Sequence, residues 1–354
     1  MQLCGFPAAE VGFDRAGELV GDRGAAVREL AAGTTDLLVL CHGWGHRLYA
    51  ALAKSLRSVT DGEPGRGIAL ACVRWPSSEP PGGDLPQRLD QLRDLRPGHR
   101  LTIDAAADLV PALTARATAR TAFAAALLSV ATRGAEDRED ASAQLFSLPG
   151  GTVMDRLAKP AAERLLDYLV HYELKARAGT VGERGLAPLL DALARPDLRI
   201  HLAGHGFGGR LVTAAANARP AGSSATLTLL QAMVSRYGFS ADWDDGRPGE
   251  FRRVLDGRVV TGPILVTHSV HDAAADVPYS IAETLVSGSY GGIGRHGAQR
   301  TAEAVTAELL PVGGSYRWRP GVPHNLRADR FVGSHTDVCG PQIAHALWSA
   351  IAAS

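Results

Sequence analysis

The residues best suited to do chemistry in this chain are a glycine-rich turn, an aspartate and a histidine, in that order. The turn is Gly204-His205-Gly206-Phe207-Gly208, which follows an apolar run at 199–203 and precedes a helix-like run at 209–218. A strand, a tight turn and a helix in this order surround the catalytic serine of the pattern G-x-S-x-G. Gly206 occupies the serine position here, so the hydroxyl that would attack a substrate is absent.

The acid and the base that would accompany such a serine follow in the expected order. Asp272 ends the apolar run that begins at Pro263, and His335 lies on a polar turn before the last helix-like segment. This order of nucleophile, acid and histidine is the one that the elbow motif predicts. Asp276 is an alternative to Asp272 as the acid, and the sequence leaves this choice open.

Backbone donors for an oxyanion are expected from two places. The segment His42-Gly43-Trp44-Gly45 directly follows the apolar run at 37–41, which makes the Trp44 N–H one candidate and the Phe207 N–H the other. His42, Gly43 and His205 flank these donors and are candidates to line the substrate pocket.

A rival interpretation of the turn is a dinucleotide-binding loop. Gly204, Gly206 and Gly209 match G-x-G-x-x-G, and they follow a strand and open a helix. Such a loop needs an acidic residue about 20 positions later to bind the ribose. Residues 225–234 contain none, which disfavours this interpretation.

Several separated motifs together resemble a bacterial group of the α/β-hydrolase superfamily whose elbow reads G-H-S-F-G. The motifs are His42-Gly43-Trp44, Trp75-Pro76-Ser77, the altered elbow, the run from Gly262 to His268, Tyr290-Gly291-Gly292-Ile293-Gly294-Arg295, and His335-Thr336-Asp337-Val338. The resemblance covers most of the chain outside about 80–195, and it implies an esterase-like, lipase-like or peptidase-like ancestry. It also places the family's nucleophile at position 206, where glycine removes acyl-enzyme chemistry.

Three interpretations of Gly206 remain open at the level of sequence. The chain is a disabled variant of a working serine hydrolase, or a pseudo-hydrolase that binds a small ligand or a protein partner. Alternatively, it is an enzyme in which His335 and Asp272 act as a general base on water or on the substrate itself. Glycine accepts the strained backbone of such a turn, so the fold survives the loss of the serine.

The wider pattern predicts an α/β fold with a mostly parallel central sheet flanked by helices. Short apolar runs bounded by turn residues alternate with helix-like segments, as in covered parallel sheets. The expected strands are at 37–41, 68–73, 199–203, 226–230 and 264–267, and the expected helices at 48–58, 209–218, 281–287 and 342–352.

One segment interrupts this alternation and predicts an insertion. Residues 1–79 and 196–354 form the expected hydrolase core, and residues 80–195 form a helical cap or lid. Within this region, 76–97 is expected to be a loop, 154–175 an amphipathic helix and 132–142 a charged loop.

Composition narrows the class of protein further. The 37 basic residues balance the 37 acidic ones without a basic tract, which argues against nucleic-acid binding. No apolar run approaches the roughly 20 residues that span a bilayer, and no secretory leader is visible, so a cytoplasmic location is expected. The histidines match no metal-binding spacing, so we expect a small ester or acyl-type ligand and neither a metal nor a cofactor. The sequence does not determine the oligomeric state.

Overall fold

The computed structural model groups the chain into two compact units. It describes residues 1–21, 23–43, 48–60, 67–77, 83–131, 139, 142–157, 161–286 and 288–354. Unit 1 comprises Met1–Ser77, Arg177–Ala275 and Gly292–Ser354, and unit 2 comprises Ser78–Ala176 and Asp276–Gly291. Each unit is taken by itself below.

Unit 1 is built on a nine-stranded, mostly parallel sheet. Its strand order is β1-β2-β4-β3-β5-β6-β7-β9-β8, and β1 is antiparallel to β2 while the other neighbours are parallel. The strands are β1 (Gln2–Leu3), β2 (Phe6–Gly12), β3 (Asp36–Cys41), β4 (Ile68–Arg74), β5 (Arg199–His205), β6 (Thr226–Leu230), β7 (Ile264–His268), β8 (Val305–Glu308) and β9 (Pro323–Arg327). The predicted α/β class with a mostly parallel sheet is therefore confirmed.

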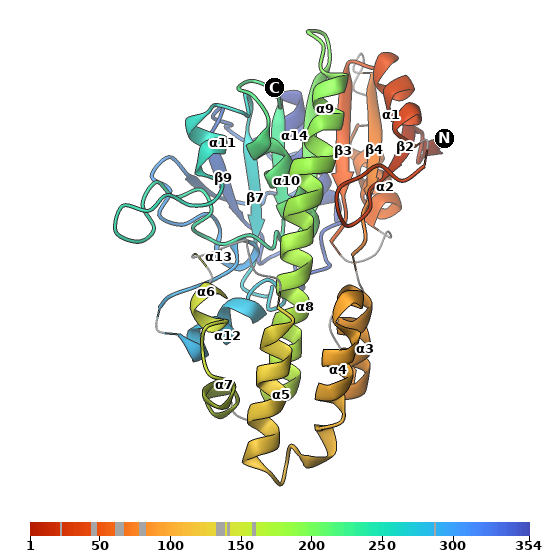
Figure 1. The fold of residues 1–354 in the computed structure, drawn as a ribbon. Coiled ribbons are helices and arrows are strands. Elements are labelled where there is room, and N and C mark those ends of the chain that lie inside the picture. Colours follow the sequence, from red (N-terminus) through yellow and green to blue (C-terminus); the bar gives the residue numbers. More distant parts are fainter. Residues whose placement is uncertain are drawn as a thin grey trace. The chain divides into compact units, whose positions relative to one another are not determined.

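Helices cover both faces of this sheet, which explains why its central strands are apolar throughout. Leu38 and Leu40 of β3 pack in one core with Leu52 of α2 (Leu48–Thr60) and Leu347 of α14 (Pro341–Ala352). Because side chains alternate along a strand, Val39 points to the opposite face. That face carries α1 (Arg23–Ala32), α9 (Ala187–Leu193) and α10 (Phe207–Ala218) (Figure 1).

Two short helices and one irregular segment complete unit 1. The helices are α11 (Arg252–Asp256) and α13 (Ile293–His296), and the π-helical segment is η4 (Val181–Leu186). A Cβ built on Gly182 of η4 would lie 2.2 Å from the Leu211 carbonyl oxygen, so η4 is pressed against α10. This close packing explains why residues 177–195, placed in the insertion from sequence, group with the sheet.

A buried ionic cluster ties together the amino ends of the central strands. Asp36 accepts hydrogen bonds from Arg199 at 2.8 and 2.9 Å and lies 3.1 Å from Nε2 of His201. Burial by itself would raise the pKa of Asp36, but the bonds from His201, Arg199 and Thr35 outweigh it and hold the pKa below its usual range. The cluster joins β3 to β5 at the edge of the sheet opposite to Gly206.

Unit 2 is helical in the residues that the structure describes. Its elements are α3 (Leu85–Leu95), η1 (Pro97–His99), α4 (Arg100–Ala107), η2 (Val110–Ala112), α5 (Ala117–Ser129), α6 (Ser142–Leu145), α7 (Gly150–Leu157), most of α8 (Ala161–Thr180), and α12 (Val277–Leu285). The unit adds residues 276–291, which the sequence assigned to the core. Its action as a lid stays a prediction.

The predicted loop at 76–97 is wrong for most of its length. Helix α3 begins after Asp84, whose side chain accepts from the Gln87 N–H at 3.0 Å, while the Gln87 side chain accepts from the Asp84 N–H at 3.0 Å. This reciprocal capping box, with Pro86 in the first turn, starts a helix. The proline and the charged residues of this segment had led to the prediction of a loop. The described residues of the predicted helix at 154–175 belong to α7 and α8, and residues 158–160 between them lie outside the described ranges, as does most of the predicted loop at 132–142.

Candidate functional site

The candidate site lies at the carboxyl ends of β3 and β5, where the strand order reverses. From β3 the chain continues to β4 on one side, and from β5 it continues to β6 and β7 on the other. In open parallel sheets, ligands bind outside the carboxyl ends of strands at such a switch point. His42 and Gly43 follow β3 and Gly206 follows β5, so the topology brings the sequence candidates to this point.

The turn at Gly206 has the strained backbone that a nucleophile elbow requires. Gly206 has φ 55° and ψ −122°, a conformation that L side chains rarely adopt. Its N–H donates to the Leu230 carbonyl at 3.1 Å, and its carbonyl accepts from the Met233 N–H at 2.9 Å. A Cβ on Gly208 would lie 2.3 Å from the Cys41 carbonyl oxygen. Gly208 therefore allows the turn to pack closely against the end of β3.

His335 and Asp272 form a buried hydrogen-bonded pair. Nδ1 of His335 lies 3.0 Å from Oδ1 and 3.1 Å from Oδ2 of Asp272. Asp272 is fully buried and His335 is 6% exposed. The Ala275 N–H also donates to Asp272 at 2.9 Å and orients its carboxylate. Asp276, the alternative acid, occupies the N-cap position of α12 in unit 2, and the structure pairs His335 with Asp272.

The second nitrogen of His335 faces the position of the missing serine. A Cβ built on Gly206 would lie 3.0 Å from Nε2 of His335 and 3.4 Å from its Cε1. Gly206, Asp272 and His335 come from three separate loops of unit 1 and meet here. A carboxylate only accepts hydrogen bonds, so Nδ1 carries a proton, and in a neutral imidazole Nε2 then has the lone pair, on the side that faces Gly206.

His205 supports His335 from the preceding position of the elbow. Its Nε2 lies 2.8 Å from the His335 carbonyl oxygen, which only accepts, so Nε2 is the donor. The two rings are 4.6 Å apart between centroids. Burial, and after it the neighbouring His335, lowers the pKa of His205 to about 3. His205 is thus a neutral hydrogen-bond donor, and its N–H is directed at the protein backbone.

The loop after β3 packs directly on the elbow. A Cβ on Gly43 would lie 2.9 Å from the His205 carbonyl oxygen and 3.4 Å from the Gly206 Cα atom. Only glycine fits this approach without a shift. His42 is fully buried, with its ring stacked on Trp75 and its carbonyl accepting from the Trp75 indole N–H at 3.0 Å. That burial makes His42 part of the packing beneath the loop.

Of the two candidate oxyanion donors, the structure describes Phe207 and does not describe Trp44. Phe207 is the first residue of α10 and is fully buried. The N–H groups of a first helical turn stand outside the intrahelical ladder and carry a partial positive charge. Trp44, the other candidate, lies outside the described residues.

Sequence reasoning missed Tyr49, which braces the same loop. Its hydroxyl donates to the Val73 carbonyl and accepts from the His42 N–H, the latter at 3.3 Å. Tyr49 lies on α2, after the loop, and no motif marks it. The Tyr49 hydroxyl reaches the His42 N–H only because α2 folds back over β3.

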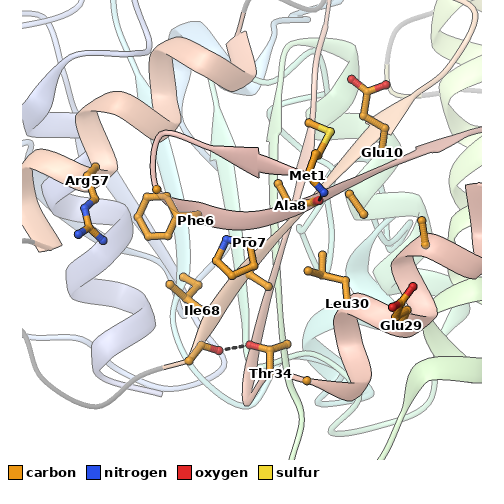
Figure 2. Close-up of a pocket in the computed structure, with 16 residues that line it drawn as sticks. Met1, Phe6, Pro7, Ala8, Glu10, Glu29, Leu30, Thr34, Arg57 and Ile68 are labelled. Carbon is orange, nitrogen blue, oxygen red and sulfur yellow. Dashed lines mark hydrogen bonds between the residues drawn. The ribbon is translucent and has the colours of Figure 1, made fainter.

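A cavity of about 770 Å³ lies elsewhere in unit 1 (Figure 2). Its lining includes Phe6, Pro7, Leu30, Thr34 and Ile68, near the amino ends of β3 and β4. It contains none of the candidate site residues, and Gly67 in its wall adjoins residues 61–66, which lie outside the described ranges.

The described part of the chain offers neither a metal-binding cluster nor a helix that could span a membrane. No group of three or more histidine, cysteine, aspartate or glutamate side chains there is arranged to hold a metal ion. No helix there is long and apolar enough to cross a membrane. A dinucleotide-binding loop would need an acidic residue near the end of β6, the neighbour of β5. β6 ends in Leu230 and is followed by Gln231, so this residue is absent.

Comparison with known proteins adds no relative: no family model matches the chain, and neither a curated protein nor a solved structure does.

Proposed function

We propose that this chain has the α/β-hydrolase fold and hydrolyses a small ester or acyl-type molecule without a serine nucleophile. The observation that carries the proposal is the pairing of His335 Nδ1 with Asp272 at 3.0 Å, with Nε2 directed at Gly206. An imidazole held in this way takes a proton at Nε2, and the carboxylate stabilises the imidazolium that forms.

The order of parts along the chain supports the fold assignment. In this fold the nucleophile turn joins a central strand to a helix, one oxyanion donor follows an earlier strand, and the acid precedes the histidine. The corresponding parts here are Gly206 between β5 and α10, the segment that begins with His42 and Gly43 after β3, Asp272 after β7 and His335 after β9.

The reaction needs only groups that this chain and water supply. A water molecule attacks the acyl carbon while Nε2 of His335 takes one of its protons. The oxyanion that develops is stabilised by the Phe207 N–H at the start of α10. The oxyanion then re-forms the C=O bond, the bond between the acyl carbon and the leaving oxygen breaks, and that oxygen takes the proton from Nε2. General base catalysis of this kind contributes about 10²–10⁴-fold in rate.

The test compares the unmodified protein with His335→Gln on p-nitrophenyl acetate and p-nitrophenyl butyrate. We expect turnover above buffer in the unmodified protein and a loss of about 10²–10⁴-fold in His335→Gln. His345→Gln is the matched control, because His345 lies on α14 and bonds the Gly314 carbonyl outside the site. Circular dichroism melting establishes that both variants fold.

A second variant tests the interpretations in which the unmodified protein does not hydrolyse esters. Gly206→Ser supplies the hydroxyl that Nε2 would activate, and we expect it to react with a fluorophosphonate probe while the unmodified protein does not. If the unmodified protein equals buffer and only Gly206→Ser reacts, the base-only proposal is wrong, and the chain is either a disabled variant of a serine hydrolase or a pseudo-hydrolase that binds a ligand or a partner. If neither reacts, the hydrolase ancestry of the site is also wrong.

A further inference from the structure

Ser269 is a fully buried serine at the start of the loop that carries Asp272. It directly follows β7 and precedes Asp272 by three positions. Its N–H donates to the carbonyl of Gly294 in α13 at 3.0 Å, and its own carbonyl accepts from the Asp272 N–H at 3.0 Å. The backbone of Ser269 is therefore held by α13 and in turn holds Asp272.

The hydroxyl of Ser269 joins this loop to the loop that carries His335. It donates to the Val332 carbonyl at 2.8 Å and accepts from the His271 N–H at 3.2 Å. The bond from the N–H two residues later is a local turn that serine commonly forms. The bond to Val332 is different, because it joins positions 63 residues apart and ends three residues before His335. One hydroxyl thus connects the two loops close to the Asp272–His335 pair.

The hydrogen bond of this pair depends on the separation of the two loops. Nδ1 of His335 lies 3.0 and 3.1 Å from the carboxylate oxygens of Asp272, within the normal range for an N–H···O bond. Such a bond weakens steeply when its length leaves that range. A displacement of ~1 Å in a catalytic arrangement lowers the rate by about 10²-fold. A contact that sets the separation of the loops therefore affects both the bond and the rate.

Resting on the proposed function, we infer that Ser269 is a positioning residue for the base. Its hydroxyl sets the separation between the Asp272 loop and the His335 loop, and with it the length of the hydrogen bond that orients the imidazole. Ser269→Ala removes the partner that the hydroxyl provides to the Val332 carbonyl, in a place where both residues are fully buried. A buried polar group without its partner is unfavourable, so we expect the two loops to move apart in this variant.

Ser240 provides a matched control, because it has the same burial and the same kind of hydrogen bonds elsewhere in unit 1. Its hydroxyl donates to the Arg300 carbonyl at 2.7 Å and accepts from the Asp242 N–H at 3.2 Å. Neither partner belongs to the candidate site. Ser240→Ala and Ser269→Ala therefore remove equivalent bonds, and only Ser269→Ala removes one between the loops of the acid and the base.

The first measurement is NMR of the imidazole N–H groups in protein with isotopically labelled histidine. The His335 signal is assigned by its loss in His335→Gln. An imidazole proton bonded to a carboxylate resonates far downfield, and its signal moves upfield or broadens when the bond lengthens. We expect this change in Ser269→Ala and an unchanged signal in Ser240→Ala. The signal reports the bond itself and does not require turnover.

The second measurement is steady-state turnover of p-nitrophenyl acetate. We expect Ser269→Ala to lower kcat by about 10–10²-fold with KM unchanged, because the fully buried Ser269 acts through the base and not on the substrate. Ser240→Ala should retain both constants. If circular dichroism shows that Ser269→Ala does not fold, Ser269→Cys replaces it, and its weaker thiol donor should cause the same changes to a smaller extent.

The outcomes separate this inference from the proposed function. An unchanged His335 signal in the Ser269 variant overturns the inference, and so does an equal change in Ser240→Ala, which would indicate a general loss of stability. A changed signal with unchanged kcat, in a protein whose turnover depends on His335, overturns the role of Ser269 in the reaction. If turnover does not depend on His335, the proposed function is wrong, whereas a signal that changes only in the Ser269 variant still supports the positioning of the pair.

Discussion

Replacing Gly206 by alanine should destabilise the protein by about 1–3 kcal/mol. The residue has φ 55° and ψ −122°, and holding an L side chain in such a sparsely populated region requires about 1–3 kcal/mol. The added Cβ would also lie 3.0 Å from Nε2 of His335, so the imidazole must move back by a few tenths of an ångström. For a chain of 354 residues, with an unfolding entropy of about 0.7 kcal/mol/K, this free energy corresponds to a fall of about 1–4 °C in Tm.

Gly206→Ser should be less destabilising than Gly206→Ala at neutral pH. The two variants share the Cβ and the backbone strain, but the serine hydroxyl can donate to Nε2 of His335. A hydrogen bond of this kind contributes about 0.5–1.5 kcal/mol.

The assay is differential scanning calorimetry of the unmodified protein and both variants at neutral pH. Gly98→Ala is the control, since a Cβ there would meet no atom within 4 Å. An alanine variant as stable as the unmodified protein would show that position 206 is not held at positive φ. A serine variant no more stable than the alanine variant would show that Nε2 does not face the turn.

Three further predictions follow from the same structure. Gly43→Ala should lower the free energy of unfolding by about 1–3 kcal/mol in urea titration, because its Cβ would lie 2.9 Å from a backbone oxygen of the elbow; an unchanged midpoint would contradict the close approach. Asp272→Asn should lower the His335-dependent turnover of p-nitrophenyl acetate by about 10²–10⁴-fold without loss of folding, because an amide no longer stabilises the imidazolium; unchanged turnover would exclude Asp272 as the orienting group. Stability should fall as the pH drops below about 4, because the folded pKa of Asp36 is depressed and its contribution is lost as the pH falls toward that value. Asp36→Asn should flatten this dependence in acid unfolding curves, and an unchanged slope would assign it to other carboxylates.

The central part of the fold could be predicted because local pattern and burial agree there. The five expected strands correspond to β3, β4, β5, β6 and β7, each a short apolar run covered on both faces. The four outer strands, β1, β2, β8 and β9, were not predicted. In β9, His324 and Asn325 look polar in sequence, but Asn325 is buried by bonds to the backbone of Ala298 at 2.8 and 3.0 Å. When the polar side chains of a strand are hydrogen-bonded to a distant loop, the local sequence does not show the apolar pattern that predicts a strand.

The sequence by itself determined which groups are available for chemistry: an elbow without a hydroxyl, an acid after one strand and a histidine after another. These depend on residue type and on order along the chain, which a sequence contains. Only the tertiary structure decided that His335 pairs with Asp272 and that Nε2 lies 3.0 Å from the position of a Cβ on Gly206. The physical reason is that three loops separated by more than 60 residues meet only when the parallel sheet orders its strands. The distances among them are a property of that packing.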